Sequence, residues 1–193
     1  MDKKEKLGLD EIVEAIEVLS ALDLAALAKK LNQDPHHVFC LMGDGELQEG
    51  QVWESLMSGP KLGAPDHHLD NLCVILDYNG IQLDNFVKKI LDLEPVADKV
   101  KAFGWPVLDI NGHDLGQIDK ALDQALATKG TPTFIVAHTV KGKGVSFMEN
   151  DPEWHGKSPK PNEAVEAIRE IVGEPVPAWV GPVISELQAM GKK

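Results

Sequence analysis

Four short apolar runs, each closed by glycine or polar residues, divide the chain between residues 37 and 140. They are "HVFCLM", "NLCVILDYNG", "WPVLDING" and "TPTFIVAHT". Runs of this length, rich in β-branched and aromatic residues and bounded by turn formers, predict buried β-strands.

Amphipathic segments alternate with these strands. Residues 10–31 carry apolar side chains at helical spacing and predict one helix or two. Residues 46–58, "EPVADKVKAFG" and "HDLGQIDKALDQALATKG" predict three further helices, the last with Asp114 as its cap. "PNEAVEAIREIVG" and "GPVISELQAMG" predict a helical tail, whereas the two prolines and two glycines of "SGPKLGAPDHH" predict a loop that ends the preceding helix early.

This alternation predicts an α/β fold, a parallel sheet with helices on both faces, in a single domain over residues 1–193. In such sheets, ligands bind beyond the carboxyl ends of the strands. The polar stretches "GDG", "DYNG", "DINGHD" and "HTVKGKG" all fall at these ends. The candidate site is therefore expected along one edge of the sheet.

Composition narrows the classes of protein. The 193 residues, 43% of them hydrophobic, can bury one substantial core. No apolar run approaches the roughly 20 residues of a membrane-spanning helix, and the N-terminus lacks a signal-peptide pattern, so a cytoplasmic protein is expected. A net charge of −12 argues against a nucleic-acid surface.

Cys40 and Cys73 lie within apolar runs and are predicted to be buried, reduced thiols.

Asp44 stands between Gly43 and Gly45 where the first strand ends. Glycines let the backbone turn sharply and approach a ligand, and a helix starting just after them would present free N–H groups to a phosphate. A carboxylate beside a phosphate requires a cation, and Mg²⁺ prefers such oxygen ligands. The alternative for Asp44 is an ordinary turn or capping acid.

Asn79, in "DYNG", follows the second strand and offers a neutral oxygen. Taken alone it is equally well explained as a turn residue before Gly80. Because Asn79 and Asp44 both follow strands, the pair favours a magnesium site.

Longer blocks carry a family resemblance. "GDGELQEGQVWES", "LDNLCVILDYNGIQLDN", "AFGWPVLDINGHD" and "TPTFIVAHTVKGKGVSFMENDPEWHGKSP" resemble the diphosphate-binding domain of transketolase, particularly the N-terminal subunit of two-chain transketolases. The resemblance implies the thiamine diphosphate-binding fold, with a family core at 24–160, a divergent helical segment at 1–23 and a helical tail at 161–193. Because the family carries a further segment ahead of this core, an N-terminally shortened domain is expected, and its effect on cofactor and substrate binding is open.

The resemblance also implies site residues. Asp44, Asn79 and the backbone carbonyl of Ile81 would hold Mg²⁺. The implied cofactor-binding residues are Gly43, Asp44, Gly45, Asn79, Ile81, Lys141 and His155. The implied catalytic residues are His155, Glu49 and Glu54, the two glutamates approaching a partner chain. Without the resemblance, Lys141 would be a solvated loop charge, His155 a turn residue, and the glutamates acids favourable in the first turns of a helix.

The implied function is transfer of a two-carbon ketol unit between sugar phosphates, as in the pentose phosphate pathway, using thiamine diphosphate and Mg²⁺. The implied partner is a C-terminal, pyrimidine-binding transketolase subunit in a homo- or hetero-oligomer, without which the chain is expected to bind cofactor weakly and to be inactive. Two alternatives remain: a subunit of another thiamine diphosphate enzyme, of the 2-oxo-acid dehydrogenase or deoxyxylulose phosphate synthase type, or a non-catalytic interaction fragment.

Overall fold

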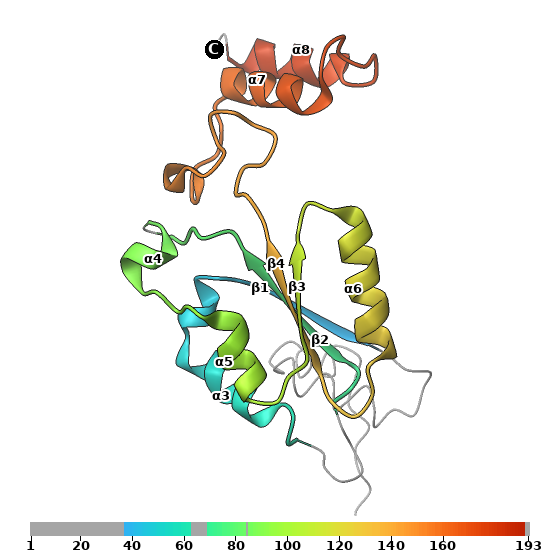
Figure 1. Ribbon diagram of the computed structural model, residues 1–193. Coiled ribbons are helices and arrows are strands. Elements are labelled where there is room, and N and C mark those ends of the chain that lie inside the picture. Colours follow the sequence, from blue (N-terminus) through green and yellow to red (C-terminus); the bar gives the residue numbers. More distant parts are fainter. Residues whose placement is uncertain (1–36, 63–68, 84, 192–193) are drawn as a thin grey trace, which may run out of the picture. The chain divides into compact units, whose positions relative to one another are not determined.

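The computed structural model describes residues 37–62, 69–83 and 85–191 (Figure 1). The predicted helix over residues 10–31 and part of the predicted loop after residue 58 lie outside these ranges. The described elements are β1 (Val38–Gly43), η1 (Glu46–Gln48), α3 (Gly50–Ser58), β2 (Leu72–Tyr78), α4 (Val87–Ile90), α5 (Val96–Ala102), β3 (Val107–Asn111), α6 (Leu115–Ala127), β4 (Thr133–His138), η2 (Pro152–Trp154), α7 (Pro161–Val172) and α8 (Gly181–Met190).

The four strands form one parallel sheet in the order β1-β2-β4-β3. β1 pairs with β2 from Val38 opposite Leu72 to Gly43 opposite Asp77. β3 pairs with β4 up to Asn111 opposite His138. The predicted α/β fold with a parallel sheet is confirmed, and the carboxyl ends of neighbouring strands share one sheet edge.

Two compact units make up the described chain. The sheet unit comprises residues 37–77 and 94–138, and the loop-and-hairpin unit comprises residues 78–93 and 139–191. The chain passes from the first unit to the second directly after Asp77 and again after His138. The single domain predicted over residues 1–193 remains a prediction, because this division into two units does not test it.

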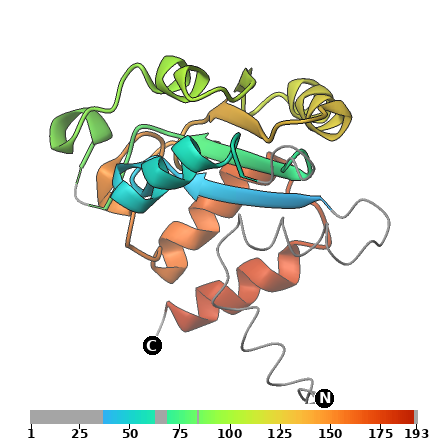
Figure 2. The ribbon, with the colours of Figure 1, turned by 90° about the horizontal axis from the view of Figure 1, so that it is seen from below.

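Helices cover both faces of the sheet, with α6 on one face and α3 and α5 on the other (Figures 1 and 2). Beneath α6, Ala121 and Ala125 pack on Cys73 and Ile135. On the opposite face Phe134 is fully buried. Its ring packs edge-on against the Trp105 ring, with the ring centroids 6.1 Å apart.

The end of α3 is tied to the segment before β3. The Trp105 indole Nε1–H donates to the carbonyl of Leu56 over 2.7 Å. A Cβ at Gly59 would lie 2.5 Å from the Trp105 ring, so the chain leaves α3 through a glycine. The helix ends at Ser58, just before Pro60, as the prolines of this segment predicted.

β1 is less buried than its apolar sequence predicted. Phe39 and Leu41 are 47% and 70% exposed, because β1 is an edge strand of the sheet that the described residues form and its residues alternate between faces. Cys40 is correspondingly half-buried, so the prediction of a buried thiol is wrong for Cys40 and confirmed for Cys73.

The two thiols cannot meet within the sheet. Phe39 is opposite Cys73, so the neighbouring Cys40 points to the other face. Burial raises the pKa of Cys73 to about 11. Burial and, second, the charge of Glu46 raise the pKa of Cys40. Both thiols are therefore protonated at neutral pH and poorly nucleophilic.

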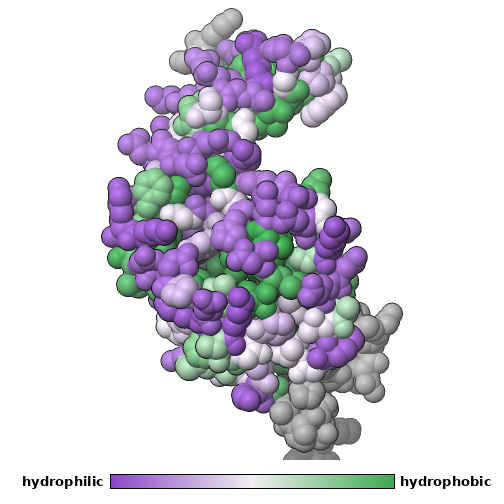
Figure 3. Space-filling view, viewed as in Figure 1, coloured by the Kyte–Doolittle hydropathy of each residue, from purple (hydrophilic) through white to green (hydrophobic). Residues whose placement is uncertain are grey.

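The loop-and-hairpin unit has its own small apolar cluster. Helices α7 and α8 pack side by side through Val165, Val180 and Ile184. Polar residues predominate over this hairpin on the face shown in Figure 3.

None of the helices in the described ranges has the length and apolar character needed to span a membrane.

Candidate functional site

Asp44 is buried directly after β1, with 2% of its surface exposed. The preceding Gly43 N–H donates to the Glu46 carboxylate over 2.6 Å, which folds the loop back on itself. A carboxylate this deeply buried requires polar or cationic neighbours, since transfer of an isolated charge from water is very costly. Asp44 lies at the carboxyl end of β1, the edge of the sheet where a ligand site is predicted.

The glycines beside Asp44 are not explained by backbone conformation. Gly45 has a φ of −66°, which any residue can adopt, and a Cβ at Gly43 would make only ordinary contact with Glu46 at 3.5 Å. The chain turns at Asp44 and Gly45, but the conformation of this turn does not require glycine. The helix directly after them is the single 3-10 turn η1, because α3 begins only at Gly50.

Asn79 begins the loop-and-hairpin unit after β2. Its side-chain oxygen accepts the Ile81 N–H over 3.0 Å, and between them Gly80 has a φ of +76° that favours glycine. Ile81 is 2% exposed and bridges to Phe86, so this turn is firmly held. Asn79 thus serves as a turn residue, which was one of the two alternatives for it.

The loop after β4 carries Lys141 in a tightly closed turn. The Lys141 carbonyl accepts the Asn150 N–H over 3.0 Å. Gly142 has a φ of +74°, and a Cβ there would lie 2.5 Å from the Met148 carbonyl oxygen, so glycine is required. This loop therefore holds the backbone of Lys141 in one conformation.

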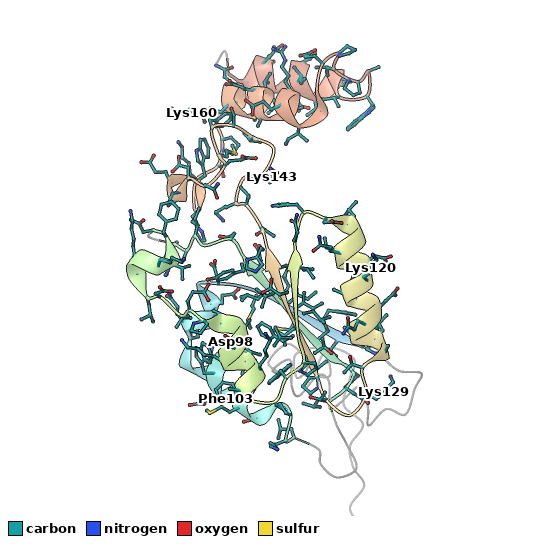
Figure 4. All side chains as sticks on the ribbon, viewed as in Figure 1. Asp98, Phe103, Lys120, Lys129, Lys143 and Lys160 are labelled. Atoms are coloured by element: carbon teal, nitrogen blue, oxygen red, sulfur yellow. The ribbon has the colours of Figure 1, made fainter. Side chains whose placement is uncertain are left out.

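The two lysines of "KGKG" have different surroundings. Lys143 is exposed, and its Nζ lies 3.5 Å from the Glu149 carboxylate (Figure 4). Lys141 is half-buried, and no ion pair to it is made by the part of the chain that the structure describes. Lys141 is thus the better placed of the two to contribute its charge to a ligand.

His155 is exposed at the end of η2, whose start is capped by the Asp151 carboxylate accepting the Glu153 N–H. The preceding Trp154 packs on Phe147, with ring centroids 5.4 Å apart, and the Lys157 ammonium lies 4.0 Å above the Trp154 ring. The aromatic contact holds Trp154, the neighbour of His155, while His155 itself is exposed.

Glu49 and Glu54 are exposed at the start and in the middle of α3. Glu49 is the N-cap residue but makes no capping hydrogen bond through its side chain, and the first turn of α3 holds no acid. The alternative of two acids placed for the helix dipole is therefore weak for Glu54.

The predicted metal ligands are one carboxylate, one amide oxygen and one backbone carbonyl. This set of hard oxygen donors fits Mg²⁺, which keeps waters and substrate oxygens in its shell. No cluster of three or more His, Cys, Asp or Glu side chains occurs among residues 37–62, 69–83 and 85–191. Asp44 and Asn79 belong to different units, so their pairing remains a prediction.

Two polar pairs escaped the sequence analysis. His138 Nε2, at the end of β4, lies 2.8 Å from Oδ1 of Asp109, in the middle of β3. Glu170 of α7 accepts two hydrogen bonds from Ser146. Both pairs depend on strand register or on a long-range contact, for which the sequence contains no local signal.

A parallel sheet with helices on both faces, a buried acid and polar loops beyond its strand ends is typical of α/β ligand-binding domains. The chain belongs to the transketolase family, because the profile described as "Transketolase, thiamine diphosphate binding domain" matches residues 14–183. The resemblance predicted from the sequence is thereby confirmed.

Two curated relatives are subunits of transketolases. An apulose-4-phosphate transketolase subunit from Phocaeicola vulgatus is 36% identical over 146 residues, which cover 76% of this chain and 50% of that protein. The 6-deoxy-6-sulfo-D-fructose transketolase subunit SqwG of a Clostridium species is 38% identical over 149 residues, covering 77% and 52%. The chain thus spans about half the length of these relatives.

A solved structure supports the same family. The transketolase of Campylobacter jejuni superposes with a TM-score of 0.71 at 30% identity, covering 89% of this chain and 28% of that chain. The comparison confirms the thiamine diphosphate-binding type of fold.

Proposed function

We propose that this chain is the N-terminal subunit of a two-chain transketolase and binds thiamine diphosphate through Mg²⁺. With a pyrimidine-binding partner chain, it transfers a two-carbon ketol unit between sugar phosphates. The observation that carries this proposal is Asp44, a buried carboxylate between glycines after β1, within a domain of the thiamine diphosphate-binding family.

Asp44, Asn79 and the Ile81 carbonyl would hold the Mg²⁺, and Gly43 and Gly45 would let the diphosphate come close. Since neither glycine has a positive φ, backbone conformation does not require them, and space for a ligand is a reason for their small size. Lys141 and His155 would offset the diphosphate charge, which matters in a chain of net charge −12.

Thiamine diphosphate, when bound, supplies a carbanion and an electron sink for breaking and forming the carbon–carbon bond. The chain's own residues bind and orient it. His155, exposed and held through Trp154, could exchange a proton or hydrogen bond with the sugar substrate.

The rest of the site would come from a partner. This chain spans about half of its curated relatives, and both of these are themselves named as transketolase subunits. The exposed Glu49 and Glu54 would face the partner chain. Their replacement by Ala should reduce turnover with the partner present and leave cofactor affinity of the isolated chain unchanged.

Calorimetric titration of Mg²⁺–thiamine diphosphate tests the proposal, with and without a pyrimidine-binding transketolase subunit. Asp44→Asn should weaken cofactor binding about a hundredfold because it removes the charged Mg²⁺ ligand. Glu46→Gln is the matched control, since it removes a charge from the same loop while Gln can still accept the Gly43 N–H. Equal affinities for Asp44→Asn and wild type would overturn the site.

Turnover distinguishes the enzyme class. Ketol transfer from a ketose phosphate should appear only when both chains are present. Decarboxylation of pyruvate instead would place the chain with another thiamine diphosphate enzyme, and cofactor binding without either activity would contradict the transketolase proposal.

A further inference from the structure

Glu170, an exposed residue of α7, contacts one loop residue with both carboxylate oxygens. Its Oε1 accepts the Ser146 hydroxyl over 2.8 Å, and its Oε2 accepts the Ser146 backbone N–H. Twenty-four positions separate the two residues, and both lie in the loop-and-hairpin unit. A carboxylate accepting two hydrogen bonds fixes both the position and the orientation of its donor.

Ser146 lies at the centre of the loop that carries Lys141. The adjacent Val145 is 4% exposed, and its carbonyl accepts the N–H groups of Met148 and Glu149. The loop then closes through the bond from the Asn150 N–H to the Lys141 carbonyl. A restraint on Ser146 therefore acts on the backbone of Lys141.

The same residue is linked to His155. Phe147 follows Ser146 directly and packs on Trp154, which directly precedes His155. Ser146 thus links α7 to both residues proposed to contact the cofactor. The contacts of Glu149 with Lys143 and with the Gly144 N–H lie within the loop and do not fix it to a helix.

We propose that Glu170 is a positioning residue that holds the Lys141–His155 loop in its cofactor-binding conformation through Ser146. This inference rests on the proposed function, because it assumes that Lys141 and His155 contact thiamine diphosphate. Glu170 itself carries a negative charge, so a direct electrostatic effect on an anionic cofactor would be repulsive. Positioning and charge therefore predict opposite changes when Glu170 is neutralised.

The test compares Glu170→Ala, Glu170→Gln and Ser146→Ala with the matched control Glu166→Ala. Glu166 is exposed one turn earlier on α7, so its loss removes the same charge. Titration of Mg²⁺–thiamine diphosphate into the full chain with its partner should show affinity reduced about tenfold by Glu170→Ala. Glu170→Gln, which keeps one good acceptor, and Ser146→Ala, which keeps the backbone donor, should show smaller losses.

Hydrogen exchange of the cofactor-free chain supplies a second readout. Amides of residues 141–150 should exchange faster in Glu170→Ala than in Glu166→Ala, while those of β2 and β4 should be unchanged. Affinity that rises or equals that of Glu166→Ala would overturn the positioning role, and so would faster exchange without any loss of affinity.

The two proposals can fail separately. If Asp44→Asn binds cofactor as wild type does, the proposed cofactor site is wrong whatever Glu170 does. If Asp44→Asn loses binding while Glu170→Ala does not, the site stands and the positioning role of Glu170 is wrong.

Discussion

The sheet unit and the loop-and-hairpin unit hold their proposed site residues by different means. In the sheet unit, Asp44 follows a strand of a sheet whose centre is apolar, and Phe134 there has no exposed surface. In the other unit, Lys141 and His155 lie on loops fixed by hydrogen bonds and ring contacts near the surface.

This difference separates stability from site geometry. Apolar burial contributes most of the free energy of folding, whereas a hydrogen bond contributes little net stability but sets direction. Core substitutions in the sheet unit should therefore change the free energy of unfolding. Substitutions at the polar contacts of the loops should change cofactor affinity more than overall stability.

The largest expected effect is that of Phe134→Ala. Removing this fully buried ring should lower the free energy of unfolding by about 3–5 kcal/mol, since the lost contacts with Trp105 leave a cavity. Urea unfolding followed by Trp fluorescence measures the change. The comparison variant Ile184→Ala, in the α7–α8 cluster, should speed amide exchange in the hairpin and leave the strands protected. Loss of strand protection in Ile184→Ala would contradict the separate cores.

Alkaline pH tests burial within the sheet unit. The pKa of Cys73 is raised in the folded state from 9.0 to about 11, so its contribution to stability is fully present below pH 9 and is lost as pH rises toward 11. At pH 10.5, just below the folded-state pKa, the loss should amount to about 2 kcal/mol. Urea midpoints at pH 7.5 and 10.5 measure it. Cys73→Ala should lack this part of the pH dependence, and an identical pH dependence in both proteins would refute the burial effect.

Two glycines sharpen the description of the Lys141 loop. Gly142→Ala combines a positive φ with a Cβ 2.5 Å from the Met148 carbonyl oxygen, whereas Gly144→Ala has a positive φ and only an ordinary contact, at 3.9 Å. Gly142→Ala should lower the free energy of unfolding by about 1–3 kcal/mol and weaken cofactor binding, because the backbone of Met148 must move. Gly144→Ala should have a smaller effect on both stability and cofactor affinity. Equal effects on cofactor affinity would show that the closed turn does not matter.

The sequence was sufficient to predict the described strands, the longer helices and the family, but not α4, η2 or the contacts that support the site. The apolar runs and the turn residues that bound them predicted the four described strands, and the sequence also predicted the Asp114 cap, because these signals are local. The burial of β1 was overestimated, because an edge strand and a central strand can share one apolar composition. The contact between Glu170 and Ser146 depends on how α7 packs, and no spacing in the sequence encodes that.

The smallest predicted effect concerns the start of α6 in the sheet unit, where a polar contact resembles those of the loops. Asp114 accepts the N–H groups of Gly116 and Gln117. Its pKa is lowered chiefly by the hydrogen bond from the Gln117 backbone, then by that from the Gln117 side chain. Asp114→Ala should lower the melting temperature by a few degrees at pH 7, because two N–H groups lose their acceptor.

The pH dependence and a matched variant complete this test. Because the folded-state pKa lies below the ordinary value of 3.8, the stabilisation is fully present above that pH and is lost as pH falls through the lowered pKa. The difference between wild type and Asp114→Ala, followed by circular dichroism, should therefore shrink only in acid. Asp119→Ala removes an exposed charge from the middle of α6 without touching the cap, and should change the melting temperature less. If both variants have the same melting temperature at pH 7, Asp114 contributes only its charge and not its capping hydrogen bonds. The polar contacts of the sheet unit would then matter as little for its stability as those of the loops are expected to matter for theirs.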